Sequence, residues 1–305
     1  MMKKRIQFSK AFLPCAIVSA VLVIAGVISI VTRGINFSID FKSGYIVEAR
    51  IDSNPSVEDV RSALSGSEGV SVKAIGSGET AAYQIRMGAE KQDNDIEGTI
   101  KSALANKYSG VEILKSDFIS SKLSKTYAMQ ALFLLLGTML CIWIYAAIRF
   151  RWDFALGSII ALIHDTLIMF AFLAVFQVEF STTTIAAVLT IIGYSINDTV
   201  VILDRVRSNI QKLEVTKFDE IINQSLSETL SRSLITTITT LFAVVSLYIF
   251  TTGTIHDFAW ALIIGLISGC YSSIFISSGF ISLVRKNWKP EYGLHATSVK
   301  KPSAN

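Results

Sequence analysis

Residues 181–203 read STTTIAAVLTIIGYSINDTVVIL, a long apolar run whose only charged residue is Asp198. A helix needs about 20 mainly apolar residues to cross the hydrocarbon core of a bilayer, so this run is long enough to span it. Five further windows of the same character lie at residues 12–32, 127–148, 154–176, 234–251 and 257–284. The sequence therefore predicts a polytopic α-helical membrane protein with six transmembrane helices.

The overall composition agrees with a membrane protein. Of the 305 residues, 51% are hydrophobic and 17% are charged, whereas a soluble domain carries about 25% charged residues. The net charge of +4 is too small to predict nucleic-acid binding. The odd set of cysteines, Cys15, Cys141 and Cys270, falls within apolar runs, so we interpret them as packing residues rather than disulfides or metal ligands. No cofactor or metal is expected.

Basic residues are distributed unequally among the short loops, which predicts the orientation. Loops on the cytoplasmic side carry an excess of Lys and Arg. In the termini and short loops, basic residues lie on one side only: Lys3, Lys4, Arg5, Lys10, Arg149, Arg151, Arg205, Arg207, Lys212, Lys217, Arg285, Lys286 and Lys289. Those of the long segment between the first two windows do not count, because long loops translocate largely regardless of charge. The opposite loops, 177–180 and 251–256, have none. We therefore expect an inner-membrane protein with both termini in the cytoplasm.

This topology divides the chain into four parts. They are an N-terminus with the first helix (1–33), an exported domain (34–126), a five-helix bundle (127–284) and a cytoplasmic tail (285–305). The first window is too long for a cleaved signal, and no small-residue cleavage site closes it before Arg33. We interpret it as a retained signal anchor.

Residues 44–118 change from long apolar runs to short periods. Alternating apolar residues predict strands near 47–51, 70–74, 82–87 and 111–117, and helical spacing predicts helices near 57–64 and 96–104. The order β-α-β-β-α-β is that of a ferredoxin-like α+β unit. The exported part contains no His, no Cys and no Gly-rich loop between strand and helix, so we expect a binding or scaffold role.

Three ionisable residues stand out in or beside the predicted spans. Such a group costs about 2.5–3.5 kcal/mol at a helix centre, so it is a functional candidate by default. Asp165 follows His164 midway along the third span. Asp198 lies six residues before Asp204, about 9 Å inside the end of the fourth span. Arg232 stands at the start of the fifth span, where we expect its side chain to reach Asp198.

Two interpretations of these residues remain open. Burial favours the neutral form of a carboxyl group, whereas a nearby guanidinium favours the charged form. A change that separates Arg232 from Asp198, or admits water, would then load or release a proton. We favour this ion-coupling role over an ion pair that only locks helices together. For Asp165 the ion-coupling and the structural interpretation are equally favoured, because His164 or neighbouring hydroxyls would provide hydrogen-bond partners for a purely structural carboxyl group.

Small and hydroxylic residues in the last two spans suggest packing roles. Ala261, Gly265, Gly269, Ser273 and Ser277 place a small residue at every fourth position of the sixth span. Membrane helices use such stripes for close approach. In the fifth span the hydroxyls of Thr236, Thr237, Thr239 and Thr240 either bond helix carbonyls, which we favour, or line a hydrated path.

Residues 193–205, GYSINDTVVILDR, resemble the fourth-span signature of the SecF family of protein-export membrane subunits. Five more runs resemble the family in order: GINFSIDF (34–41), RF (149–150), ALIHD (161–165), LSRSLITT (230–237) and GCYSS (269–273). The chain departs from the pattern at Lys42-Ser43-Gly44, where the family has a Gly pair, and at Ser233, where Thr is commoner.

This resemblance implies an accessory subunit of the Sec protein translocase. Such a subunit works with SecD beside the SecYEG channel and the SecA motor, and an ion gradient drives late stages of preprotein export. The resemblance implies ion coupling by Asp198 and Arg232, and we add Asp165. Tyr194, Ser195, Asn197, Thr199 and His164 are expected to support that site, and Gly265, Gly269 and Ser273 to pack helices.

The competing functions are an RND-like half-exporter of small molecules or lipids and a non-conducting scaffold of the translocon. None of the three is an enzyme. The coupling ion, proton or sodium, stays open, with protons favoured.

Overall fold

The computed structural model describes residues 6–65, 70–76, 82–89, 95–212 and 217–288. Within them, six helical segments are long and apolar enough to span a membrane, which confirms the six-span prediction. Their bounds are η1 and α1 (Phe8–Ala11, Phe12–Arg33), α4 (Ser121–Arg149), α5 (Trp152–Val175), α6 (Thr182–Lys212), α7 (Phe218–Phe250), and α8 with η3 and α9 (Gly253–Tyr271, Ser272–Ser277, Ser278–Val284). The basic segments 1–5 and 289–305, used above for orientation, lie outside the described residues.

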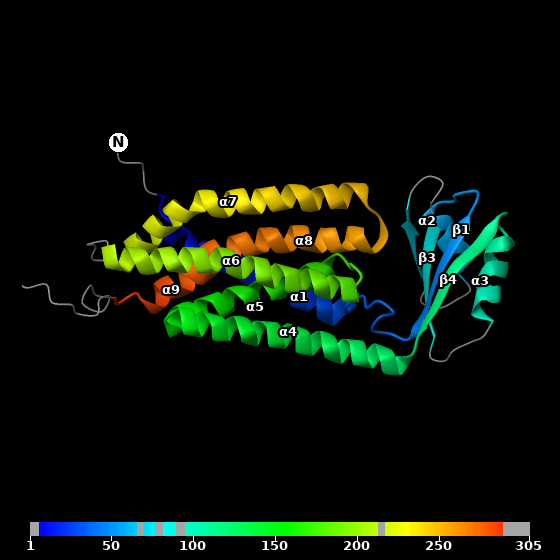
Figure 1. The fold of residues 1–305 in the computed structure, drawn as a ribbon, viewed down its shortest axis with the longest axis horizontal. Coiled ribbons are helices and arrows are strands. Elements are labelled where there is room, and N and C mark those ends of the chain that lie inside the picture. The colour runs from blue at the N-terminus through cyan, green and yellow to red at the C-terminus, as the bar shows by residue number, and fades with distance from the viewer. Residues whose placement is uncertain (1–5, 66–69, 77–81, 90–94, 213–216, 289–305) are drawn as a thin grey trace, which may run out of the picture.

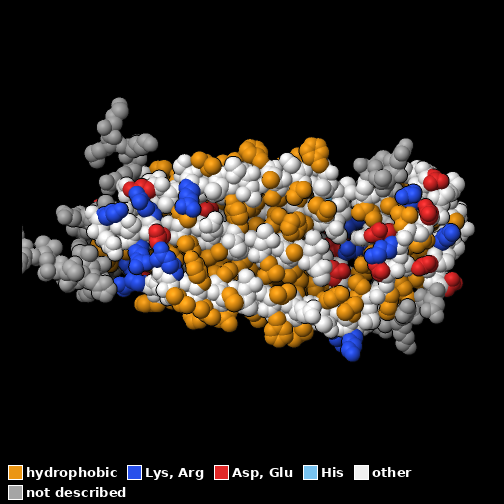
Figure 2. All heavy atoms as spheres, in the orientation of Figure 1, with side chains coloured by type: hydrophobic (Ala, Val, Ile, Leu, Met, Phe, Trp, Pro, Cys, Tyr) orange, Lys and Arg blue, Asp and Glu red, His pale blue; other side chains and the backbone are white. Residues whose placement is uncertain are grey.

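The bundle has central and peripheral helices. α5, α6 and α8 bury half or more of their most apolar window, whereas α1, α4 and α7 leave most of theirs exposed. In Figure 1 the helices run side by side as one elongated bundle. Figure 2 shows apolar side chains along its length and Lys and Arg side chains gathered at the end away from the small domain.

Two helices extend beyond the apolar windows. α7 begins at Phe218 rather than near residue 234, and α6 continues to Lys212 rather than ending near residue 203. The extensions pack against each other through buried Val206, Ile221 and Leu226. A hydropathy window stops at the first charges, whereas the helix continues because these apolar faces remain buried.

The sixth span is not one regular helix. α8 ends at Tyr271, a π-helical turn η3 covers Ser272–Ser277, and α9 completes the span. π-helical turns are rare and occur frequently at functional sites. The sequence analysis predicted a continuous helix here, because the small-residue spacing of the span is that of a regular α-helix.

The small domain has the predicted strand and helix order. Its elements are β1 (Gly44–Ile51), α2 (Val57–Ala63), β2 (Ser71–Ile75), β3 (Ala82–Gly88), α3 (Ile96–Ala105) and β4 (Val111–Ile119). The sheet order is β2-β3-β1-β4 and every described pairing is antiparallel, as in a ferredoxin-like unit. Figure 1 places this domain at one end of the bundle.

The departure at Lys42-Ser43-Gly44 keeps the glycine that the backbone needs. A Cβ on Gly44 would lie 2.3 Å from the carbonyl oxygen of Met87, on the neighbouring strand β3. Ser43 carries its side chain without altering the local pairing, since its carbonyl still accepts from the Ala89 amide at 3.1 Å. Close strand approach therefore requires glycine at position 44.

Candidate intramembrane polar site and its link to the small domain

Asp165 lies at the centre of the bundle, and its side chain is fully buried. Its Oδ2 accepts hydrogen bonds from Ser195 at 2.6 Å and Ser272 at 2.7 Å. Its Oδ1 accepts from Ser268 at 2.7 Å and lies 3.2 Å from Nδ1 of His164. An ionised carboxylate accepts through both oxygens, so this cage satisfies the charged form without a Lys or Arg side chain.

The cage depends on the close approach of α6 and α8. A Cβ on Gly265 would lie 2.3 Å from Cγ1 of Ile191, and one on Gly269 would lie 3.1 Å from the Cβ of Ser195. Any larger residue would separate the two helices. The small-residue stripe therefore brings the serines of both helices to one carboxylate.

A chain of polar contacts leads from Asp165 to α1. Nε2 of His164 lies 3.0 Å from the Ser19 hydroxyl, which lies 3.0 Å from the hydroxyl of Tyr271. Tyr271 donates to the carbonyl oxygen of Cys15 at 2.6 Å. A cavity of about 260 Å³ lies beside Ser19, His164 and Tyr271. This contribution of α1 was not predicted, because Ser19 is an isolated hydroxyl in an apolar window.

Asp198 has a different environment. Its side chain is 5% exposed and faces Ser233 and Thr237 of α7, with Cys270 of α8 close by. The Ser233 and Thr237 hydroxyls are buried, yet neither completes a well-formed hydrogen bond with any described residue. Buried hydroxyls without partners are costly, so this is the less satisfied of the two carboxylate sites.

Arg232 does not form the direct contact that the sequence analysis expected. Its side chain is exposed on α7, and no ion pair within 4.0 Å joins it to Asp198 among the described residues. A helix has about 3.6 residues per turn, so when Ser233 faces α6 its predecessor points well to one side. Arg232 is still near enough for its charge to act on Asp198.

The residues that were expected to support the ion site have their hydrogen-bond partners on different helices. The hydroxyl of Tyr194 donates to the carbonyl of Thr236 at 2.8 Å and lies 3.0 Å from the Thr240 hydroxyl. Thr199 and Ser273 lie 2.8 Å apart through their hydroxyls, so Ser273 is a polar contact as well as a small packing residue. The side chain of Asn197 is exposed, and no hydrogen bond to it is seen among the described residues.

The threonines of α7 mainly bond their own helix. Thr236, Thr239 and Thr240 donate to the carbonyls of Arg232, Ile235 and Thr236 at 3.0, 2.8 and 3.0 Å. This confirms the favoured interpretation for these three. Thr237 is the exception, since it faces Asp198.

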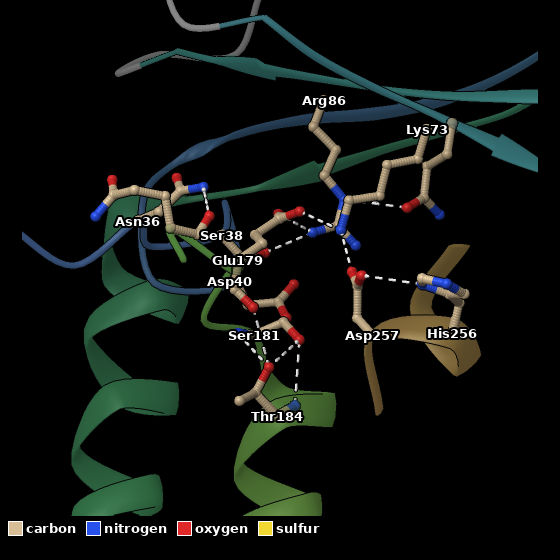
Figure 3. A network of polar contacts seen from close by, with 12 residues as sticks. Asn36, Ser38, Asp40, Lys73, Arg86, Glu179, Ser181, Thr184, His256 and Asp257 are labelled. Atoms are coloured by element: carbon tan, nitrogen blue, oxygen red, sulfur yellow. Dashed lines mark hydrogen bonds and ion pairs between the residues drawn. The ribbon is translucent and has the colours of Figure 1, made fainter. Parts of the chain in front are cut away.

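A second polar cluster, which we call the junction network, joins the small domain to the bundle. Glu179, in the loop between α5 and α6, forms ion pairs with Arg86 of β3 and, at 2.5 Å, with Lys73 of β2. Lys73 also pairs with Asp257 at the start of α8, and Asp257 lies 3.8 Å from His256. Figure 3 shows these side chains converging between the sheet and the helix ends.

Burial and charge oppose each other at Glu179. Burial would raise the pKa of its carboxyl group, but Lys73 and Arg86 together outweigh that effect and hold the pKa below its ordinary value. Glu179 is therefore charged at neutral pH. Arg86 is only 4% exposed and is further held by the Ser38 hydroxyl at 2.7 Å.

The segment after α1 completes this attachment. Oδ2 of Asp40 accepts from the backbone nitrogen and the hydroxyl of Thr182 at 3.0 and 2.9 Å. A carboxylate is favourable at the N-terminus of a helix, here α6. Phe37 and Phe180 form a backbone bridge, with Ser38 donating to the carbonyl of Phe180 at 2.9 Å. Glu179 was not predicted as a functional residue. Its position as an acidic residue in a short loop without basic residues was the sequence feature that could have indicated it.

Comparison with known families identifies this architecture. The family described as "Protein export membrane protein SecD/SecF, C-terminal" matches residues 99–287, and the "SecD/SecF GG Motif" matches residues 28–54. The chain belongs to the SecD/SecF family. The second match contains Ser38 and Asp40, so the family motif lies in the segment that attaches to the α5–α6 loop.

Individual relatives agree with the SecD/SecF assignment. Protein translocase subunit SecF of Rickettsia prowazekii is 38% identical, with 87% of this chain and 86% of that protein covered. The Borreliella burgdorferi protein of the same name is 37% identical over 94% of this chain and all of its own length. A crystal structure of SecDF from Thermus, described as a translocon-associated membrane protein, superposes with a TM-score of 0.82 at 28% identity and covers 93% of this chain.

The SecDF chain is longer than the present one. This chain spans 39% of it, and 40% of a second SecDF structure in a "Super-membrane-facing form", with a TM-score of 0.67. The family assignment and the six apolar helices identify a multi-pass membrane protein.

Proposed function

We propose that this chain is an accessory subunit of the Sec protein translocase that works with a SecD partner and uses an ion gradient, of protons in our proposal, to promote late stages of export. The names of its SecF relatives and its superposition on part of SecDF support the translocase role and the partnership. The observation that carries the ion-coupling part is a pair of buried carboxylates, Asp165 and Asp198, in one bundle with incompletely paired hydroxyls beside Asp198.

The two carboxylates have separate roles in this proposal. Asp165 is held by three serines and His164, so it organises α5, α6 and α8 around one charge. Asp198 exchanges the ion. When Asp198 loses its proton, its charge attracts the hydroxyls of Ser233 and Thr237 and the guanidinium of Arg232, and α7 moves relative to α6.

The junction network carries that motion to the small domain. Glu179 connects directly to α5 and α6, and Asp257 belongs to α8, so Lys73 and Arg86 attach the sheet to all three helices around Asp165. A shift among these helices therefore changes the position of the sheet. In this proposal the domain lies outside the inner membrane, both termini are cytoplasmic, and the sheet acts on emerging preproteins near SecYEG and SecA.

The proposal is tested by gradient-dependent export of a secretory preprotein into membrane vesicles. We expect Asp198→Asn to abolish the stimulation by the gradient, because the amide cannot exchange a proton, while SecD still co-purifies. The matched control is Asp204→Asn, six residues further along α6, which breaks an exposed ion pair with Arg149 and should leave stimulation unchanged. Equal stimulation of wild type and Asp198→Asn would leave only a scaffold role. Dissipating the proton and sodium gradients separately identifies the ion.

A further inference from the structure

A groove of about 610 Å³ opens on the side of the bundle at its basic end. It lies between the start of α1, the start of α7, and the η3–α9 part of the sixth span. Its walls are aromatic, with Phe12, Phe275 and Phe280 lining it beside the small side chain of Ala16. Gly279 lets Phe12 pack against the last helix, since a Cβ there would lie 3.3 Å from Phe12. A volume of 300–1,000 Å³ is typical of ligand pockets, so the groove is large enough for an alkyl chain.

The mouth of the groove carries two lysines that form no ion pair within the described part of the chain. They are Lys217 and Lys286, and both are exposed. Asp219 also lines the mouth, where it accepts a hydrogen bond from Ser282. The described residues that line the mouth therefore carry a net positive charge.

The arginines at the same end of the bundle behave differently. Four of them have an acidic partner: Arg149 pairs with Asp204, Arg205 with Glu228, and Arg151 and Arg285 with Asp153. Arg207 instead donates to the backbone carbonyl of Arg149. Lys217 and Lys286 differ from the other basic residues in that both line the groove.

We propose that this groove binds an anionic phospholipid, with one acyl chain between the aromatic walls and the phosphate between Lys217 and Lys286. Basic pockets between membrane helices bind anionic head groups, and the aromatic walls supply the apolar surface that the chain needs. A peptide would bring backbone polar groups into walls that offer few hydrogen-bond partners, so a lipid is the better fit.

Occupancy of the groove also bears on Asp165. Phe275, in the groove wall, and Ser272, which holds Asp165, belong to the same π-helical turn. A lipid in the groove therefore supports the turn that holds the buried carboxylate. The binding itself does not depend on the proposed export function.

The test is lipid titration of the full-length protein in mild detergent, followed by native mass spectrometry. Phosphatidylglycerol should bind more tightly than phosphatidylcholine with identical chains. Lys217→Ala/Lys286→Ala should weaken phosphatidylglycerol binding about 25-fold, since each surface lysine contributes about fivefold. The matched control, Arg207→Ala/Lys212→Ala, removes the same charge from α6, which does not line the groove, and should change binding less than twofold.

A second variant tests the groove separately from the charge. Ala16→Phe keeps both lysines but fills the space between the walls, and it should abolish one bound lipid while the protein remains monodisperse. Inorganic phosphate should not compete, because without a chain it gains nothing from the walls. Equal affinity for both lipids, equal losses in the two double variants, or lipid binding that requires removal of residues 289–305 would each refute the proposal.

Discussion

Replacing Glu179 by Gln tests whether the junction network holds the small domain against the bundle. The change keeps the size of the side chain and removes its charge, which leaves Arg86 buried without an acidic partner. Breaking a buried ion pair costs about 3–5 kcal/mol. We expect about 3 kcal/mol, because Lys73 keeps Asp257 and Arg86 keeps its hydrogen bond to Ser38. That corresponds to about a hundredfold shift toward the detached state.

Hydrogen exchange measured by mass spectrometry in lipid nanodiscs reports this shift. The amides of Ser38 and Phe180 bond across the attachment at 2.9 and 2.8 Å, so their protection should fall about a hundredfold if the domain detaches. Amides that pair β1 with β3 should keep theirs. Glu112→Gln is the matched control, since its ion pair with Arg50 is exposed and contributes less than about 1 kcal/mol.

A compensating variant separates charge from geometry. Arg86→Met combined with Glu179→Gln leaves no buried unpaired guanidinium, so much of the lost protection should return. Unchanged protection in Glu179→Gln alone would refute the reasoning. Equal loss in Glu179→Gln and Glu112→Gln would also refute it, because the effect would then not depend on burial.

Two further predictions concern pH and packing. In the folded protein the pKa of Glu179 lies below its ordinary value. The charged carboxylate therefore stabilises the junction fully at any pH above the ordinary pKa, and this stabilisation is lost only as the pH falls through the lowered pKa. Hydrogen exchange between pH 7 and pH 5 should accordingly show an intact junction. Gly265→Ala should destabilise the bundle by about 1–3 kcal/mol in thermal unfolding, since its Cβ meets Ile191. Gly137→Ala should not destabilise the bundle, because a Cβ at that position has no neighbouring atom within 4 Å.

The local residue pattern was sufficient to predict the six spans and the β-α-β-β-α-β order of the small domain. A span shows itself by its own apolar length, and a strand or helix by its own periodicity. The ends of α6 and α7 were predicted less well, because amphipathic extensions are stabilised by packing on each other rather than by hydropathy.

The sequence also pointed to Asp165 and Asp198, since a carboxylate in an apolar run is conspicuous by itself. It indicated His164 and neighbouring hydroxyls as partners of Asp165, which the structure confirms, but not which helices supply the hydroxyls. The serines around Asp165 come from α6, α8 and η3, and the exposed position of Arg232 follows from how α7 is rotated. Helix rotation depends on side-chain packing between distant segments, which no single window contains.

The sequence by itself thus determined that this is a six-span protein with a ferredoxin-like domain and two carboxylates within its spans. Only the tertiary structure decided that Asp165 is enclosed by serines and that Asp198 lacks a direct contact with Arg232. It also decided that Glu179 joins the domain to the bundle. The physical reason is that secondary structure and membrane insertion are governed by neighbours along the chain, whereas partners of a buried charge are selected by contacts between segments far apart in it.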